Sequence, residues 1–143
     1  MQNKIVRHEI DIHVPASALW RILTCPQHMR QFLFNGEHLS DWKEGSMIMA
    51  YKKQSGEIRL IARGRVEEVV PGQRLRLSFF EVDSFSAEPL CLCYELWPAF
   101  DATKLMLAVE LRPTCADAMM EESRMMLQKI KWLAEFGESG LTK

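Results

Sequence analysis

Hydrophobic and polar residues alternate along the first segment of the chain, over residues 4–14. One side of this segment carries Val6, His8, Ile10, Ile12 and Val14, and the other side carries Arg7, Glu9, Asp11 and His13. A period of two residues is typical of a β-strand with one buried face. Pro15 follows directly, so the sequence predicts a strand that ends there and leads into a different kind of element.

Helical spacing of apolar residues appears after this strand and again near the C-terminus. Pro15 suits the start of a helix, because its missing N–H would be unpaired there, and a short helix is expected over residues 16–23, with an apolar side of Leu19, Trp20 and Leu23. A second short helix is expected from Pro26, with Met29 and Phe32 on its apolar side. One long helix is expected over residues 117–136, with a broad apolar face that includes Met126, Leu127, Ile130 and Leu133.

The chain between these helices predicts a run of strands joined by tight turns. The expected strands cover residues 47–53, 57–70, 74–82, 90–98 and 103–112, with turns at Ser55-Gly56, at Pro71-Gly72 and through Asp101. Neighbouring short strands joined in this way pair antiparallel. The prediction is therefore an α+β protein in one domain, residues 1–143. A curved antiparallel sheet of about six strands would wrap around a long C-terminal helix, with two short helices after the first strand.

Alternation also sorts the strand residues into two faces. The predicted inner face is almost entirely apolar and must be covered by the final helix; it includes His8, Ile10, Ile12, Leu60, Ala62, Leu75, Leu77, Phe79, Leu92, Tyr94, Leu96, Leu105, Leu107 and Val109. The outer face mixes arginines and glutamates with four larger apolar residues, Ile61, Phe80, Trp97 and Met106. This is more apolar surface than a solvated sheet needs, and we expect a homodimer through this face. Scattered surface apolar residues are the alternative.

Composition narrows the range of partners. The 143 residues include 18 Lys and Arg against 19 Asp and Glu, which gives a net charge of −1 and argues against a nucleic-acid surface. No apolar stretch is long enough to span a membrane, and the N-terminus does not resemble a signal peptide, so a cytoplasmic protein is expected. The four cysteines, Cys25, Cys91, Cys93 and Cys115, match no zinc pattern and read as free thiols. No metal and no cofactor are expected.

Several motifs, taken in order, resemble one superfamily. They are Pro15-Ala-Ser-Ala-Leu-Trp20-Arg-Ile-Leu23-Thr24-x-Pro26, the Asp41-Trp42-x-x-Gly45 turn, Gly64-x-Val66-x-x-Val69-x-Pro71-x-x-Arg74-Leu75, Leu92-Cys-Tyr94-Glu-Leu96 and Leu127-x-x-Ile130-x-x-Leu133. Their order and spacing resemble the SRPBCC/START-like superfamily, which has the helix-grip fold of the birch pollen allergen. Within it, the chain is similar to the branch of the activator of heat-shock-protein-90 ATPase. It departs from the commoner pattern at Ser46, where a second glycine often follows Gly45.

This resemblance implies a fold with a cavity and leaves the activity open. Members bind lipids, sterols or other apolar molecules, some catalyse cyclisation or dehydration, and some act as co-chaperones. We expect a small hydrophobic or amphipathic ligand between the sheet and the C-terminal helix. The expected ligand-binding residues are His8, Trp20, Phe32, Trp42, Leu60, Phe79, Tyr94, Leu107, Met126 and Ile130. The alternatives are a cyclase- or dehydratase-like enzyme in the same cavity, or a chaperone-associated protein without a ligand.

His8 and Tyr94 are the candidate chemical groups on the predicted inner face. A histidine and a tyrosine can orient a ligand carbonyl or move a proton. The simpler interpretation is a hydrogen-bonded core histidine and a tyrosine that reaches the rim of the cavity. His13, His28 and His38 are expected at the surface or in loops, too scattered for a metal site. No motif for a catalytic triad is present, so catalysis is not assigned to any residue.

Overall fold

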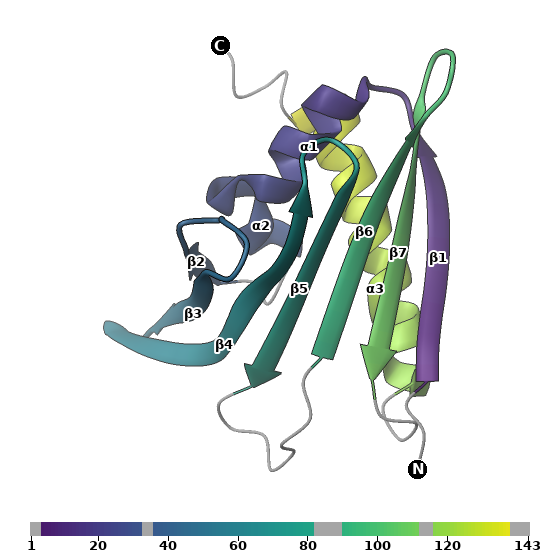
Figure 1. Cartoon of the computed structure of the whole chain (residues 1–143). Coiled ribbons are helices and arrows are strands. Elements are labelled where there is room, and N and C mark those ends of the chain that lie inside the picture. Colours follow the sequence, from purple (N-terminus) through teal and green to yellow (C-terminus); the bar gives the residue numbers. More distant parts are fainter. Residues whose placement is uncertain (1–3, 33–35, 82–89, 112–115, 138–143) are drawn as a thin grey trace.

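A computed structural model describes residues 4–32, 36–81, 90–111 and 116–137. The elements follow the predicted order (Figure 1). They are β1 (Lys4–Ile12), α1 (Ala16–Thr24), α2 (Pro26–Phe32), β2 (Glu37–Leu39), β3 (Met47–Gln54), β4 (Glu57–Val70), β5 (Arg74–Glu81), β6 (Leu90–Pro98), β7 (Thr103–Leu111), α3 (Ala116–Trp132) and a π-helical turn, η2 (Leu133–Gly137). The predicted α+β helix-grip architecture is confirmed.

The sheet has seven antiparallel strands in the order β1-β7-β6-β5-β4-β3-β2. The prediction of about six strands missed β2, which has only three residues and pairs with β3 through His38 and Ala50. Three residues are too few to show an alternating pattern. The segment between α2 and β3, to which the sequence assigned no strand, therefore contributes an edge strand.

The core lies between the sheet and its helices. α3 packs chiefly on β1 and β7, while α1 contacts α2, η2 and β6, and α2 lies against β2. Figure 1 shows α3 behind the strands and α1 and α2 beside it at one end of the sheet. Leu19, Ile22 and Leu23 of α1 are fully buried, as are Ile130 of α3 and Leu107 of β7. Each such side chain contributes about 1.5–3 kcal/mol through burial, so the helices are held mainly by apolar contact.

A β-bulge in β4 corrects the predicted faces of two neighbouring residues. The register pairs Ala50 with Ala62 but Tyr51 with Leu60, so Ile61 is the extra residue. Ala50 and Tyr51 are adjacent in β3 and point to opposite faces of the sheet. Their partners Ala62 and Leu60 therefore lie on opposite faces as well. Ile61 packs against the core, whereas it was predicted on the outer face. The predicted positions of Leu60 and Ile61 are both wrong, because strict alternation does not allow for an inserted residue.

Gly64 of β4 lets an aromatic ring lie against the strand. A Cβ added at Gly64 would lie 2.2 Å from the Ser78 carbonyl oxygen and 2.8 Å from a ring carbon of Phe79. Phe79 is buried and pairs with Gly64 across β4 and β5. Gly64 is thus required by close packing of backbone and ring.

A cluster of polar contacts attaches η2 to the end of β1. Glu135 accepts hydrogen bonds from the His13 backbone N–H at 2.8 Å and from Lys131 Nζ at 2.9 Å, and its Oε2 lies 3.1 Å from His13 Nδ1. Lys131 also donates to the Asp11 carbonyl at 2.7 Å. The hydrogen bond from the His13 backbone, followed by that from Lys131, lowers the pKa of Glu135 to about 2. This cluster joins residues about 120 positions apart in the chain.

Replacing Gly64 with alanine tests the close packing. Gly64→Ala places a methyl group against a backbone oxygen that has no room to move, and we expect a loss of about 1–3 kcal/mol in the free energy of unfolding. Urea denaturation measures it. Gly56→Ala is the comparison, because a Cβ there meets no atom within 4 Å and only its φ of +81° is unfavourable, at about 1–2 kcal/mol. An unchanged stability of Gly64→Ala would contradict this account.

Replacing Glu135 with glutamine tests the polar cluster through its pH dependence. The folded-state pKa lies below the ordinary value of 4.5, so the ionised carboxylate stabilises the fold above that value, and the contribution is lost as the pH falls toward 2. At neutral pH, Glu135→Gln should lower the free energy of unfolding by about 1–3 kcal/mol. Urea denaturation at pH 7, 5 and 3 should show the difference shrinking below pH 5. Glu57→Gln, at the exposed start of β4, is the control. A difference independent of pH would exclude the carboxylate charge as its source.

Candidate functional site

A row of residues on the inner face crosses three strands at the β1 side of the sheet. His8 of β1 pairs with Leu107 of β7, which in turn pairs with Tyr94 of β6. His8 and Tyr94 are therefore two strands apart, with Cα atoms separated by about 10 Å. Leu107 is fully buried between them. The predicted pair shares a face and a row, but an apolar side chain separates its two members.

Tyr94 is a buried hydroxyl whose partner is a weak acceptor. The residue has no exposed surface, and its hydroxyl donates to Met126 Sδ of α3 at 3.3 Å. A thioether accepts hydrogen bonds only weakly. Burial raises the pKa of Tyr94, because the phenolate would be desolvated. Tyr94 therefore remains a protonated donor at neutral pH.

His8 contacts the N-terminal part of α3, whereas Tyr94 contacts its middle. Its Nε2 lies 3.0 Å from the Met120 carbonyl oxygen and donates to it, and the side chain is half-buried at the edge of the sheet. Met120 and Met126 are six residues apart, which is about 9 Å along a helix. His8 and Tyr94 thus hold α3 at two separate points.

The other predicted site residues divide into three groups. Phe32, Phe79, Leu107 and Ile130 are buried core residues. Trp20, Trp42 and Met126 are partly buried and pack against that core. Leu60 lies outside this set, because the bulge turns it away. The structure therefore gathers most of the predicted residues around the interior between the sheet and the helices.

Two histidines that were predicted at the surface are buried. His38 of β2 has 1% exposed surface, and its ring meets that of Phe79 edge-on, with centroids 6.4 Å apart. Burial lowers the pKa of His38, against the smaller opposite effects of a backbone hydrogen bond at Gly36 and the charge of Glu37. His28 of α2 is also buried, and its Nδ1 has no hydrogen-bond partner among the described residues. The sequence signal for His38 was its position between outward-facing Glu37 and Leu39, in a strand too short to recognise.

Two surface depressions lie away from the row of His8 and Tyr94. One, of about 340 Å³, is lined by Arg30, Gln31, Gly36, Glu37, Tyr51, Lys52 and Lys53. The other has the same volume and lies between residues 13–16 and the turn from Pro98 to Thr103. Neither depression includes a predicted ligand-binding residue, so they are separate from the candidate site.

Potential metal ligands are dispersed in the part of the chain that is described. Its His, Cys, Asp and Glu side chains form no group of three that could hold a metal ion. Cys25, Cys91 and Cys93 are free thiols, and Cys115 lies outside the described residues. Burial raises the pKa of Cys91 and of Cys93, which keeps both thiols protonated. Within the same residues, no helix has the length and apolar character needed to cross a membrane.

Solved structures with the same fold are numerous, but their sequences are distant. A Cytophaga hutchinsonii protein solved in solution matches with a TM-score of 0.78 and 20% identity, covering all of both chains. Protein MLL2253 from Mesorhizobium loti matches with a TM-score of 0.75 and 18% identity, over 91% of this chain and 96% of that one. DynU16, from the dynemicin biosynthetic locus, has a TM-score of 0.75 and 15% identity, over 93% of this chain and 48% of its own. Such identities show the fold alone.

Comparison at the level of families is more informative. No curated protein matches the sequence. Residues 13–135, which contain most of the described sheet and all three α-helices, match the family described as Activator of Hsp90 ATPase homolog 1-like protein. This range covers far more than half of the chain and includes every motif quoted above for the superfamily. The chain therefore belongs to the Activator of Hsp90 ATPase homolog 1-like family.

Proposed function

We propose that the protein binds a small hydrophobic or amphipathic molecule between its sheet and α3, with the Tyr94 hydroxyl as the polar group that orients it. The hydrogen bond from Tyr94 to Met126 Sδ is the observation that carries the proposal. A fully buried hydroxyl normally has a good oxygen or nitrogen acceptor. Here its acceptor is a sulfur that a ligand oxygen would replace with a gain in hydrogen-bond strength.

Met126 has the properties of a movable cover over this hydroxyl. Its side chain is partly exposed and packs on the core, so it lies between the surface and Tyr94. Methionine is unbranched with three rotatable side-chain bonds, and it adapts to different neighbours at low cost. Rotation of Met126 would leave the Tyr94 hydroxyl free to donate to a carbonyl, ether or hydroxyl oxygen. A ligand would therefore approach the Tyr94 hydroxyl along α3, past the side chain of Met126.

Apolar contact would supply most of the binding free energy. The proposed walls are Trp20, Phe32, Trp42, Phe79, Leu107 and Ile130, with His8 at the edge of the sheet, and Ile61 takes the place expected for Leu60. Burial of about 300 Å² of ligand surface would contribute roughly 7 kcal/mol before the entropic cost of association. Buried His38, in contact with Phe79, is a second polar group within the same interior.

Binding without catalysis is the function that these contacts favour. Proton transfer between His8 and Tyr94 would require both side chains to leave their contacts with α3. The raised pKa of Tyr94 also makes its phenolate a poor choice of general base near neutral pH. A cyclase- or dehydratase-like activity is therefore the weaker proposal.

Association with a chaperone is the second candidate, and the description of the family supports it. Its specific support in the structure is a set of exposed aromatic side chains, Phe100 in the β6–β7 turn and Trp132 and Phe136 at the end of the C-terminal helix.

We also propose a cytoplasmic location, supported by the free thiols of Cys25, Cys91 and Cys93, because disulfides are rare in that compartment. Self-association through Phe80, Trp97 and Met106 remains a proposal as well.

A fluorescent ketone tests the ligand site directly. The naphthalene ketone prodan is apolar, and its emission responds to hydrogen bonding at its carbonyl. We expect the protein to bind it, and Tyr94→Phe should weaken binding by about threefold to tenfold, the worth of one neutral hydrogen bond, and shift the bound emission to shorter wavelength. Tyr51→Phe is the matched control, because it removes the other of the two tyrosine hydroxyls, from the β3 position next to Leu60.

Native mass spectrometry of gently purified protein complements this titration. A co-purified apolar molecule released on unfolding would identify the class of ligand. Protein that carries no such molecule and leaves prodan unbound would indicate a packed interior. That result would overturn the ligand proposal and favour the interaction with a chaperone.

A further inference from the structure

The outer face of the sheet is formed by the outward-facing side chains of β1, β7, β6, β5 and β4. Figure 1 views the sheet from this side, with the described helices behind the strands. Its centre carries small side chains that meet across neighbouring strands: Ser78 pairs with Cys91, and Cys93 pairs with Ala108. Phe80 and Trp97 are larger and have 43% and 55% exposed surface. Small central residues with exposed aromatic residues near them suit close approach of a second sheet.

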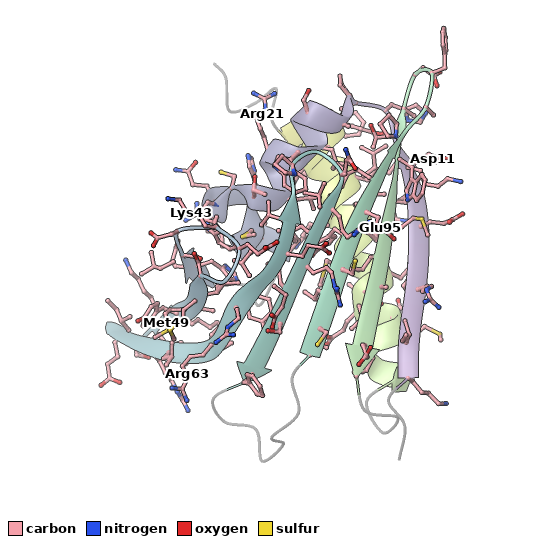
Figure 2. The ribbon with its side chains drawn as sticks, in the orientation of Figure 1. Asp11, Arg21, Lys43, Met49, Arg63 and Glu95 are labelled. Atoms are coloured by element: carbon pink, nitrogen blue, oxygen red, sulfur yellow. The ribbon has the colours of Figure 1, made fainter. Side chains whose placement is uncertain are left out.

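Charge on this face is divided between its two halves. The arginine section, on β4 and β5, carries Arg63, Arg65, Arg74 and Arg76 against the carboxylates of Glu67 and Glu68. The acidic section, on β1, β6 and β7, carries Glu9, Asp11, Glu95 and Glu110 against Arg7 and Lys104. Figure 2 shows Arg63 and Asp11 far apart across the width of the sheet. The face therefore has an excess of positive charge on one half and of negative charge on the other.

Ion pairs within one copy do not remove this division. Arg74 contacts Glu68 at 3.2 Å and Glu95 at 3.5 Å, and Lys104 contacts Glu9 at 3.7 Å. The Arg74–Glu68 and Lys104–Glu9 pairs each lie within one section and leave its net charge unchanged, while the Arg74–Glu95 pair joins the two sections at their boundary. These pairs are exposed and individually weak, so another charged surface can compete for their members.

We propose that the protein forms a symmetric dimer through this outer face, with the two-fold axis parallel to the strands. Rotation by half a turn about such an axis exchanges the two halves of the face. The arginine section of one copy then lies over the acidic section of the other, twice in the same interface. An axis across the strands would place like sections opposite each other, which costs free energy. The charge pattern thus selects both the partner, a second copy, and the direction of the axis.

The size of the face sets the strength of the dimer. Five strands about 4.8 Å apart, paired along about eight residues, give a face of roughly 24 by 27 Å, or about 650 Å² for each copy. The total of about 1,300 Å² lies at the lower end of the range for specific protein interfaces. We therefore expect a reversible dimer with a dissociation constant on the order of micromolar, and a steep dependence on salt.

Charge reversal on each section tests this arrangement. Sedimentation velocity over concentrations from low micromolar to millimolar measures the dissociation constant. Arg65→Glu with Arg76→Glu should weaken the dimer at least tenfold, and Glu9→Lys with Glu110→Lys should do the same. An equimolar mixture of the two double variants should dimerise again, since both sections of one face then carry excess negative charge and both sections of the other carry excess positive charge.

Two control variants carry the same changes in net charge away from the outer face. They are Lys43→Glu with Lys129→Glu and Glu57→Lys with Glu122→Lys, all at exposed positions, and each should stay within about twofold of the unmodified protein. Circular dichroism checks that every variant is folded. A monomer at all concentrations overturns the proposal. Reversals that behave like their controls, or a mixture that stays monomeric, exclude this face as the interface.

Discussion

The helices must keep water from the inner face of a seven-stranded sheet, and the rest of the structure depends on this constraint. α3 lies mainly over β1 and β7, so the far half of the sheet depends on α1 and α2 for its cover. Apolar burial favours the helix on this face but does not fix its position along it. Directional contacts from His8, Tyr94 and the cluster around Glu135 supply that position at three heights.

The contact at the middle height differs from the other two. His8 contacts a backbone carbonyl, and Glu135 accepts from a backbone N–H and an ammonium group, all of which are strong partners. Tyr94 has only a thioether. The two ends of α3 are therefore firmly attached, while its centre is held by the contact that costs least to exchange. A ligand that enters there need not displace the helix, and this difference connects the stability of the fold with its proposed function.

The helices, the six longer strands and their order follow from residue periodicity, because each of these elements is long enough to repeat its pattern. The misplaced residues each have a local cause. Leu60 and Ile61 exchanged faces because a bulge inserts one residue into β4, and no residue type marks that insertion. His38 was placed at the surface because β2 spans three residues. The contact between Glu135 and His13 was not predicted, because the two residues lie 122 positions apart in the sequence. The shared face of His8 and Tyr94 was predictable from alternation alone, but their common row and the sulfur acceptor of Tyr94 required the three-dimensional structure.

The irregular pairing of β4 has a consequence for how this fold changes over evolution. Its register shifts once at Ile61 and again between Val66 and Glu68, so this strand of 14 residues consists of three short segments. Each segment keeps its own assignment of inward and outward side chains. A single inserted or deleted residue near either shift would move one segment and leave the others in register. Relatives can therefore reshape one end of the interior at a time, which offers a route to new ligands in a fold whose sequences have diverged this far.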